Sequence, residues 1–509
     1  MALEYVERES TTANFDGAPK NSRFRNVLSA LFGRALMDSS ILLMLPLILS
    51  GLRDHALVLV DPDIWWHLAD ARIVCEFHRF IHVEPYSFTV AGQPWINPEW
   101  LSEIPFWLSY KSLGPVGIFL IAWLGVSANA LFIYWRSYFH SRNRGVALWV
   151  SALGFVLMWV NASSRTILFG YLALSAELAI LESAERGNVR RLWLLPPLFC
   201  VWVNLHGSWF IGMALLVLYI ACGLFRIDAG IFRQEKFSHA QQRVLLLVLI
   251  ACFVALWINP YGWRLVWNPG DMLLNQKLNT GNVTEWQPLN LSWNVGKATV
   301  FAIVLTILAN VMRPKKWKIY EFAFVFFAWY AAIDHARFTF LASVITMPWL
   351  AADVTRSFFA ETTKRKTIPV MNAVVALAVA GVIALYFPTQ KSLQKEMVAR
   401  LPLETVASLQ PSWRTLNLEG LGGLMDFEGK PSFIDTRYDT FEHHGVLKDF
   451  LDIVLMKDPL ALLDKYRIDH VLIRKNDALS YLLQRVPGWK AVRTEGSGDD
   501  FYILFARSK

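Results

Sequence analysis

Apolar segments separated by short polar loops recur along most of this chain. They lie near 35–53, 115–135, 145–161, 166–184, 192–205, 208–225, 244–259, 298–312, 319–333, 338–352 and 368–387. A helix needs about 20 mostly apolar residues to cross the hydrocarbon core of a bilayer. A helix also satisfies its own backbone hydrogen bonds there, where no water can do so. The pattern therefore predicts a polytopic α-helical membrane protein with about 11 transmembrane helices.

Composition agrees with that class and excludes others. Of the 509 residues, 55% are hydrophobic and only 18% are charged, whereas soluble domains carry about 25% charged residues. On this ground we do not expect a soluble enzyme, a disordered scaffold or a collagen-like protein. The net charge is +8, but no basic cluster alternates with aromatic residues on a polar domain. We therefore expect no nucleic-acid partner.

The basic residues indicate an orientation. Loops 136–144, 186–191, 226–243, 313–318 and 356–366 each carry three or four Lys or Arg. The alternate loops, 54–114, 161–165, 204–207, 260–297 and 334–337, are poorer in Lys and Arg for their length. Because cytoplasmic loops are enriched in Lys and Arg, the N-terminus is predicted inside and the C-terminus outside.

The chain divides into three parts. Residues 1–34 are polar and predict a cytoplasmic N-terminal tail. Residues 35–387 form the membrane region, with a first outer loop at 54–114 and a second long outer loop at 260–297. Residues 388–509 carry charges throughout. Strand-like runs at 432–435, 470–474 and 501–505, with helical patterns at 450–456, 460–466 and 479–485, predict a small C-terminal α/β extracytoplasmic domain.

The first outer loop contains two acidic, Trp-rich helix starts. In Asp61-Pro62-Asp63-Ile64-Trp65-Trp66-His67, Asp61 and Pro62 suit an N-cap and a first helical turn. Asp63, His67 and Asp70 then share one helix face. The second start is Asn97-Pro98-Glu99, and the spacing of Glu99 and Glu103 places both on one face. A purely structural role explains these residues equally well: the acidic residues would cap the helices, and the tryptophans would form an aromatic belt at the membrane surface. Carboxylates beside bulky aromatic residues can also have raised proton affinity and act as a base.

Further polar residues lie at the outer ends of the predicted spans. They are Arg165, His206, Glu285, His335 and Arg337. With the predicted topology all of them converge on one side of the membrane. Each alone is consistent with an ordinary helix end, although boundary ionisable groups are also functional candidates. The arginines have the charge and shape to hold a phosphate, and His206 suits a hydrogen bond, a proton or a ligand.

The order of these motifs carries a resemblance. Asp61-Pro62-Asp63-x-Trp65-Trp66-His67 is followed by Gly92-x-Pro94-Trp95 and Glu99-Trp100-Leu101, then by Asn204-Leu205-His206-Gly207, Asn259-Pro260-Tyr261-Gly262, Glu285-Trp286 and His335-x-Arg337. The chain resembles the GT-C superfamily of membrane glycosyltransferases over about 50–340. More narrowly, it resembles the bacterial dolichyl-phosphate-mannose-mannosyltransferase-like and rhizobial-galacturonosyltransferase-like subgroup. The run Phe433-Ile434-Asp435-Thr436-Arg437 is similar to the periplasmic domain of that subgroup.

The resemblance implies an inverting hexosyl or pentosyl transfer from a polyprenyl-phosphate-linked donor. The acceptor would be a lipid, a glycan or a protein. It implies a multi-pass protein of the inner (cytoplasmic) membrane, surrounded by membrane lipids, with a periplasmic C-terminal domain. An acidic residue of the first outer loop acts as general base in such enzymes. We carry that role to Asp63, with Asp61 and then Glu99 as alternatives.

The remaining candidates are assigned to the substrate. We assign Arg165, His206 and Arg337 to the leaving lipid phosphate, because fixed cations stabilise developing negative charge. His67, Glu285 and His335 complete the candidate substrate-binding set. Ala71 and Pro98 stand where the subgroup often has Gly and His, so a His/Glu metal site is not expected there. Carboxylates could hold Mg²⁺ or Mn²⁺, although no cofactor is required by the pattern.

Two other classes of function compete with transfer. A transporter or flippase would show internal repeats and helices broken at the bilayer midplane, whereas the polar groups here lie at span ends. A scaffolding protein would use residues 388–509 and keep the bundle as an anchor, which leaves the acidic first loop without a role.

Overall fold

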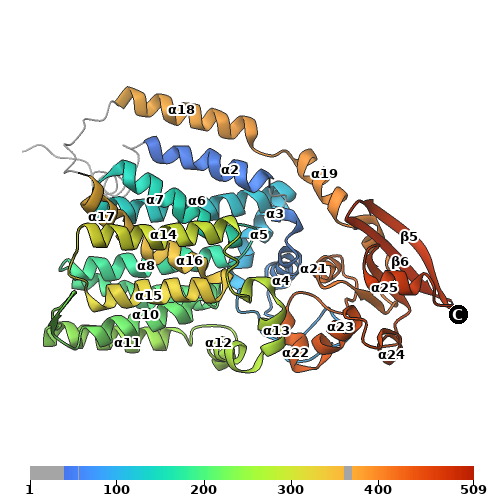
Figure 1. Cartoon of the computed structure of the whole chain (residues 1–509). Helices are drawn as coiled ribbons and strands as arrows, with labels where there is room; N and C mark the ends of the chain where they lie inside the picture. Colours follow the sequence, from blue (N-terminus) through green and yellow to red (C-terminus); the bar gives the residue numbers. More distant parts are fainter. Residues whose placement is uncertain (1–38, 55–56, 360–368, 509) are drawn as a thin grey trace, which may run out of the picture.

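The computed structural model of this chain describes residues 39–54, 57–359 and 369–508. The predicted cytoplasmic tail at 1–34 lies outside these residues. Long helices run side by side in a bundle, and a smaller mixed domain packs against one end of it (Figure 1). One apolar core extends through the bundle and into the inner side of the smaller domain. A second core fills the rest of that domain.

Each predicted apolar segment within the described residues is helical. The helices of the bundle, with short 3₁₀ or π turns beside them, are η1 (Ser39–Leu43) and α2 (Met44–Asp54), α6 (Pro115–Ser141), α7 (Arg144–Met158), η2 (Trp159–Asn161), α8 (Ile167–Glu185), η3 (Val189–Leu194), α9 (Leu195–Leu205), α10 (Trp209–Cys222), α11 (His239–Ala255), α14 (Asn294–Met312), α15 (Ile319–Asp334), η5 (Ala336–Phe338), α16 (Thr339–Leu341), η6 (Ala342–Thr346), α17 (Met347–Phe358) and α18 (Pro369–Tyr386).

Not all of these helices are long enough to cross a bilayer alone. Among the described residues five are, namely Pro115–Ser141, Arg144–Asn161, Ile167–Glu185, Asn294–Met312 and Ala336–Phe358. A sixth is reached if the helix pair Asn372–Tyr386 and Gln390–Arg400, bent by 48°, counts as one span. Others are apolar but short, such as Trp209–Cys222 and His239–Ala255. Helix length therefore supports several spans, and the number of about 11 stays a prediction.

The outer loops are folded rather than open. The first contains α3 (Leu57–Val60), α4 (Asp63–Phe77) and α5 (Trp100–Leu113), and the second contains α12 (Trp263–Asn275), α13 (Lys277–Asn282) and η4 (Thr284–Trp286). Helix α5 turns back along α6 at Gly114, whose φ of 58° favours glycine. Gly117 permits the close approach, because a Cβ there would lie 2.1 Å from the Ser109 carbonyl oxygen. This hairpin places the start of α5, with Glu99 and Glu103, beside α4.

A two-stranded hairpin joins α10 to α11 at the other end of the bundle. Its strands, β1 (Ile227–Ala229) and β2 (Phe232–Gln234), pair antiparallel. Phe232 also pairs with Trp317 in the loop between α14 and α15. Two loops that the sequence predicts on the cytoplasmic side are therefore joined by backbone hydrogen bonds.

The C-terminal domain is a small α/β domain, as predicted. It comprises α19 (Gln390–Arg400), α20 (Leu403–Ser408), β3 (Thr415–Asn417), α21 (Glu419–Phe427), α22 (Tyr438–His443), α23 (Val446–Val454), α24 (Pro459–Lys465), β4 (His470–Arg474), α25 (Ala478–Leu483), β5 (Trp489–Ser497) and β6 (Asp500–Arg507). The sheet order is β3-β4-β6-β5, with β3 parallel to β4 and the other pairs antiparallel.

The strand predicted at 432–435 was wrong. Phe433 and Ile434 are fully buried. The side chain of Asn417 makes hydrogen bonds to their backbone groups. Its Oδ1 accepts from the Phe433 amide at 2.8 Å and its Nδ2 donates to the Ile434 carbonyl at 2.7 Å. A short apolar run predicts a buried strand, but here the side chains of Asn417 and Thr89 bond to its backbone in place of a neighbouring strand.

Candidate active site

A cavity of about 610 Å³ lies where the bundle meets the C-terminal domain. Three regions far apart in the sequence form its walls. The first outer loop contributes Pro62, Asp63, Trp66, His67, Trp95, Pro98 and Glu99; helix ends and the second outer loop contribute residues such as Arg165, Thr166, His206, Asn268, Glu285, Trp286, Trp293 and Arg337; the C-terminal domain contributes Glu419, Gly420, Thr436, Arg437, Tyr438 and Asp439.

Most of the residues predicted from the sequence meet in this cavity. Those that line it are Asp63, His67, Glu99, Arg165, His206, Glu285 and Arg337. Asp61 does not line it and is buried behind Asp63. His335 does not line it either: its Nδ1 lies 3.0 Å from Asp334, and its ring packs edge-on against Trp286.

Helix α4 places Asp63 at the cavity wall. Asp61 Oδ1 accepts a hydrogen bond from the Asp63 backbone amide at 3.2 Å, across the turn that Pro62 begins. This bond orients the first turn of the helix, and His67 follows one turn later. The sequence predicted that Asp63, His67 and Asp70 share one face of this helix. Only Asp63 and His67 line the cavity. Asp70 is fully buried and belongs to a polar network away from the cavity.

Arg165 distinguishes the two aspartates. Its Nε donates to Asp61 Oδ2 at 3.0 Å, and one terminal nitrogen donates to Glu285 Oε2 at 2.5 Å. The other terminal nitrogen lies 3.9 Å from Asp63. Ser163 also donates to Asp61, at 2.8 Å. Asp61 is therefore the close partner of the cation, and Asp63 is a distant one.

The proton affinities of the two aspartates differ in consequence. Burial would raise the pKa of Asp61, but Arg165 and the Ser163 hydroxyl hold it below its usual range. The pKa of Asp63 is raised, by burial and by the negative charge of Asp61, against the weaker effect of Arg165. Two neighbouring carboxyl groups with pKa values pushed apart divide the roles of counter-ion and proton acceptor. Asp61 suits the first role and Asp63 the second.

Arg337 is the least constrained of the three arginines that line the cavity. It lies 3.7 Å from Glu285 Oε1, and its guanidinium stacks on the Trp286 ring, 4.2 Å from the centroid. Burial would raise the pKa of Glu285, but Arg165 and Arg337 together lower it. A guanidinium held by an aromatic face keeps donors free for an anion.

Glu99 is held as an anion by hydrogen-bond donors. His206 Nδ1 accepts from the Ser208 backbone amide at 3.0 Å, so the neutral ring carries its proton on Nε2, 3.1 Å from Glu99 Oε1. Thr166 donates to the other Glu99 oxygen at 2.6 Å. Burial opposes ionisation, yet His206, His67 and Thr166 lower the pKa of Glu99. Glu99 thus orients His206 rather than standing free.

A buried polar network supports His67 from behind. His67 Nδ1 lies 2.7 Å from Glu103 Oε1. The Asn97 amide donates to Glu103 at 2.8 Å and to Asp70 at 3.0 Å, and Tyr86 donates to Asp70 at 2.6 Å. Burial raises the pKa values of Asp70 and Glu103 well above their usual range. The network therefore favours the neutral form of both carboxyl groups, and burial also lowers the pKa of His67.

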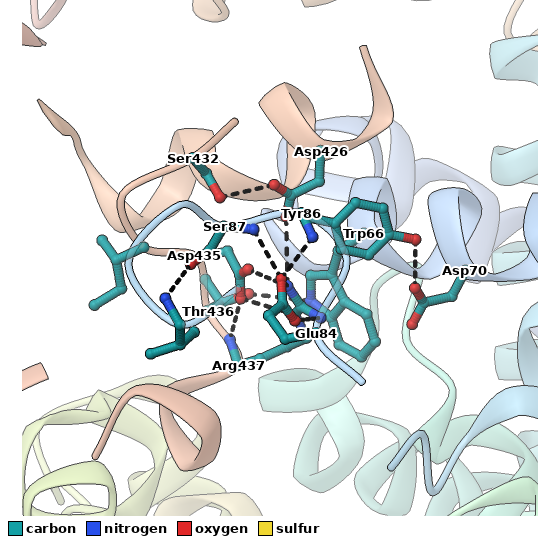
Figure 2. A network of polar contacts seen from close by, with 12 residues as sticks. Trp66, Asp70, Glu84, Tyr86, Ser87, Asp426, Ser432, Asp435, Thr436 and Arg437 are labelled. Atoms are coloured by element: carbon teal, nitrogen blue, oxygen red, sulfur yellow. Dashed lines mark hydrogen bonds and ion pairs between the residues drawn. The ribbon is translucent and has the colours of Figure 1, made fainter. Parts of the chain in front are cut away.

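The C-terminal domain supplies residues that sequence reasoning did not place in the site. Figure 2 shows Arg437 among the carboxylates of Glu84, Asp426 and Asp435. Its distances are 2.8 Å to Glu84 and 2.5 Å to Asp435, with Asp426 at 3.7 Å. The neighbouring Thr436 accepts a hydrogen bond from Trp66 Nε1 at 3.1 Å. The run 433–437 was recognised in the sequence, but nothing in it indicated contact with the first outer loop.

The carboxylates as arranged do not form a metal site. Within the described part of the chain, no group of three or more His, Cys, Asp or Glu side chains is placed to hold a metal ion. The oxygens of Asp61, Glu99 and Glu285 already accept from arginine, hydroxyl or imidazole donors. The predicted option of Mg²⁺ or Mn²⁺ therefore has no assembled ligand set among these residues, and we derive no step through a metal.

Solved structures share this architecture. The archaeal oligosaccharyltransferase AglB of Archaeoglobus fulgidus, in complex with an inhibitory peptide and a dolichol-phosphate, superposes with a TM-score of 0.51 at 10% identity. The match covers 87% of this chain and 69% of that one. The same organism's oligosaccharyltransferase tethered to an acceptor peptide gives 0.50 at 10% identity, covering 88% and 70%.

The chain has a GT-C fold. No protein-family model and no curated protein sequence matches it. At 10% identity the likeness concerns the arrangement of the chain and not its residues. The fold expected of the GT-C superfamily is thus confirmed, whereas membership of that superfamily and of the narrower bacterial subgroup stays a prediction.

Proposed function

We propose that this GT-C protein is a membrane glycosyltransferase that moves a sugar from a polyprenyl-phosphate-linked donor to an extracytoplasmic acceptor. One observation carries the proposal. Arg165 binds Asp61 closely and Asp63 only distantly, so the raised pKa of Asp63 leaves a proton acceptor in the wall of a large polar cavity. The dolichol-phosphate and the acceptor peptide bound by the neighbouring archaeal enzymes support the two substrate classes.

The proposed step is a single displacement. The Asp63 carboxylate takes the proton of the acceptor nucleophile, which forms a bond to the anomeric carbon of the sugar. The bond from that carbon to the phosphate oxygen breaks, and its electron pair leaves with the lipid phosphate. Attack from the face opposite the leaving group inverts the anomeric centre.

The leaving phosphate needs positive charge or hydrogen-bond donors. Arg337 suits this role better than Arg165, because Arg165 already contacts Asp61, Asp63 and Glu285. His206 can add its Nε2–H, which Glu99 orients. Preorganised donors aimed at developing charge supply a large share of catalysis in such transfers.

The proposed setting is the inner (cytoplasmic) membrane, with the cavity and the C-terminal domain on the periplasmic side. The basic loops at the opposite end of the bundle support this orientation. Lipid, glycan and protein all remain acceptor classes for the proposed enzyme.

The test is an Asp63→Asn variant purified gently from its own membranes. Asparagine keeps the shape but cannot take a proton, so transfer should fall by about 100-fold or more. Native mass spectrometry should then find a polyprenyl phosphate with a sugar mass still bound. Asp334→Asn is the matched control, because Asp334 is an exposed carboxylate near the cavity that does not line it. Normal transfer by Asp63→Asn would refute the base assignment, and finding only bulk phospholipid would argue against a sugar donor.

A further inference from the structure

A second cavity, of about 380 Å³, lies at the end of the bundle opposite the candidate active site. It is bounded by the end of α8, the turn η3, the β1–β2 hairpin, the start of α11 and the loop before α15. Figure 1 shows these elements far from the C-terminal domain. Three loops that the sequence predicts as cytoplasmic, 186–191, 226–243 and 313–318, therefore meet around one hollow.

The cavity is basic. The cations on its lining are Arg233, Lys236, Lys316 and Lys318, against the two carboxylates of Glu185 and Glu235. Arg233 is 63% exposed and its contact with Glu235 is 3.7 Å long. Lys316 is about half exposed and pairs with the exposed Asp228 at 3.2 Å. Exposed pairs of this kind contribute about 0–1 kcal/mol, so a phosphate can compete for these cations.

One buried acceptor in the lining has no hydrogen-bond donor in the described part of the chain. Gln234 is only 4% exposed, and its Nε2 donates to the Glu235 carbonyl at 3.0 Å. Its Oε1 is buried and accepts no hydrogen bond from any of the residues that the structure describes. A buried carbonyl oxygen without a donor costs free energy, so native structures rarely keep one. A ligand that fits this cavity should carry a hydrogen-bond donor as well as an anion.

Another part of the wall is apolar. It is formed by Val189, Leu192, Phe237 and Leu245. Trp193 and Leu194, which come directly after Leu192, are about half exposed. In a membrane protein such a surface meets acyl chains, so the cavity opens onto a region where a lipid can lie.

We propose that this cavity binds the headgroup of one anionic phospholipid whose phosphate is followed by a hydroxyl, the chemistry of a phosphatidylglycerol. The phosphate lies among Lys236, Lys316 and Arg233, and the headgroup hydroxyl donates to Gln234 Oε1. Basic pockets between membrane helices on the cytoplasmic side are known to hold anionic headgroups. This site is separate from the proposed transfer reaction and does not depend on it.

The first test measures lipid retention by the detergent-purified full chain in native mass spectrometry, with phosphatidylglycerol and phosphatidylcholine as probes. The wild type should retain one phosphatidylglycerol in preference to phosphatidylcholine. The double variant Lys236→Gln/Lys316→Gln should bind it about 30-fold more weakly, since each cation near a lipid surface contributes about 1 kcal/mol. Arg243→Gln is the control, because Arg243 is an exposed cation in the first turns of α11 that does not line the cavity.

The second test concerns the hydroxyl. Phosphatidylmethanol has the same phosphate but no headgroup hydroxyl, so the wild type should bind it about 5- to 10-fold more weakly than phosphatidylglycerol. Gln234→Leu should bind the two lipids equally. Equal retention of phosphatidylglycerol and phosphatidylcholine by the wild type would overturn the proposal. So would unchanged binding by the double variant, or displacement of the lipid by millimolar inorganic phosphate, which would indicate a site for a soluble phosphate.

Discussion

Asp61 and Asp63 are two residues apart, yet their surroundings give them opposite proton affinities. The difference arises from partners more than 100 positions away, because Arg165 and Ser163 both bind Asp61. The sequence indicated that this pair was acidic, capped a helix and lay near tryptophans. It did not reveal which member is the counter-ion, since that depends on where Arg165 points.

Thr436 offers a direct test of the base at the residue scale. Its side chain lowers the pKa of Asp63 against the larger opposing effects of burial and Asp61. Thr436→Val removes the hydroxyl and keeps the shape, so the pKa of Asp63 should rise further. Because transfer needs the carboxylate form, the acid limb of the pH–rate profile should move to higher pH. Thr436→Ser keeps a hydroxyl and should leave the limb in place; an unmoved limb in the valine variant would contradict the contact.

Glu103 gives a second prediction, about stability. Burial raises the pKa of Glu103 well above its value of 4.5 in the unfolded chain. At a pH between the unfolded and the folded pKa, the native state therefore binds more protons than the unfolded state. Stability from this group is therefore lost as the pH rises through that window. Glu103→Gln stays neutral and can keep the contacts to His67 and Asn97. Its melting temperature relative to wild type should increase from pH 5 to pH 9 in thermal unfolding, whereas a constant difference would show that Glu103 is ionised.

At the scale of elements, the helices were the predictable part. Apolar runs and basic loops indicated every bundle helix within the described residues, because a helix in lipid must be apolar along its whole length. Strands were harder, since β4 and β6 matched their predicted runs but residues 432–435 did not form a strand. The side chain of Asn417 that replaces strand pairing there has no local signal in the sequence.

The contact between α21 and α4 determines where Asp63 lies. Gly423 of α21 faces the start of α4, and a Cβ there would lie 2.7 Å from the Pro62 carbonyl oxygen and 3.1 Å from the Trp66 amide nitrogen. Backbone atoms cannot move aside cheaply, so Gly423→Ala should cost about 1–3 kcal/mol and displace α4. We expect lower transfer activity and a lower melting temperature.

Gly420 provides the matched control in the same helix. A Cβ at Gly420 would lie 3.9 Å from Pro62, an ordinary contact, so Gly420→Ala should fold and melt like the wild type. Equal melting temperatures of the two alanine variants would show that the α21–α4 contact is not close in solution.

At the scale of the whole molecule, the cavity has walls from both ends of the chain. The sequence predicted an acidic first outer loop and a separate C-terminal domain, but not that the domain closes the site. The reason is physical: the join consists of buried contacts between residues about 350 positions apart, such as Arg437 with Glu84. A residue pattern in one segment does not show which distant segment it will meet.

Arg437 is a buried cation at this join. It is buried with Glu84, Asp426 and Asp435 and lies 4.6 Å from the centre of the Trp95 ring. Removing one partner of a buried ionic cluster typically costs about 3–5 kcal/mol, because the remaining charges stay unpaired. Arg437→Gln should therefore loosen the C-terminal domain from the first outer loop, with faster hydrogen exchange at 84–90 and 432–437 and loss of transfer. Arg493→Gln, which removes an exposed pair with Glu404 in the same domain, should change neither. Slow exchange at 84–90 in Arg437→Gln, together with a loss of transfer, would show that Arg437 acts on the substrate and does not hold the domain in place. Apolar contacts would then join the two walls of the cavity.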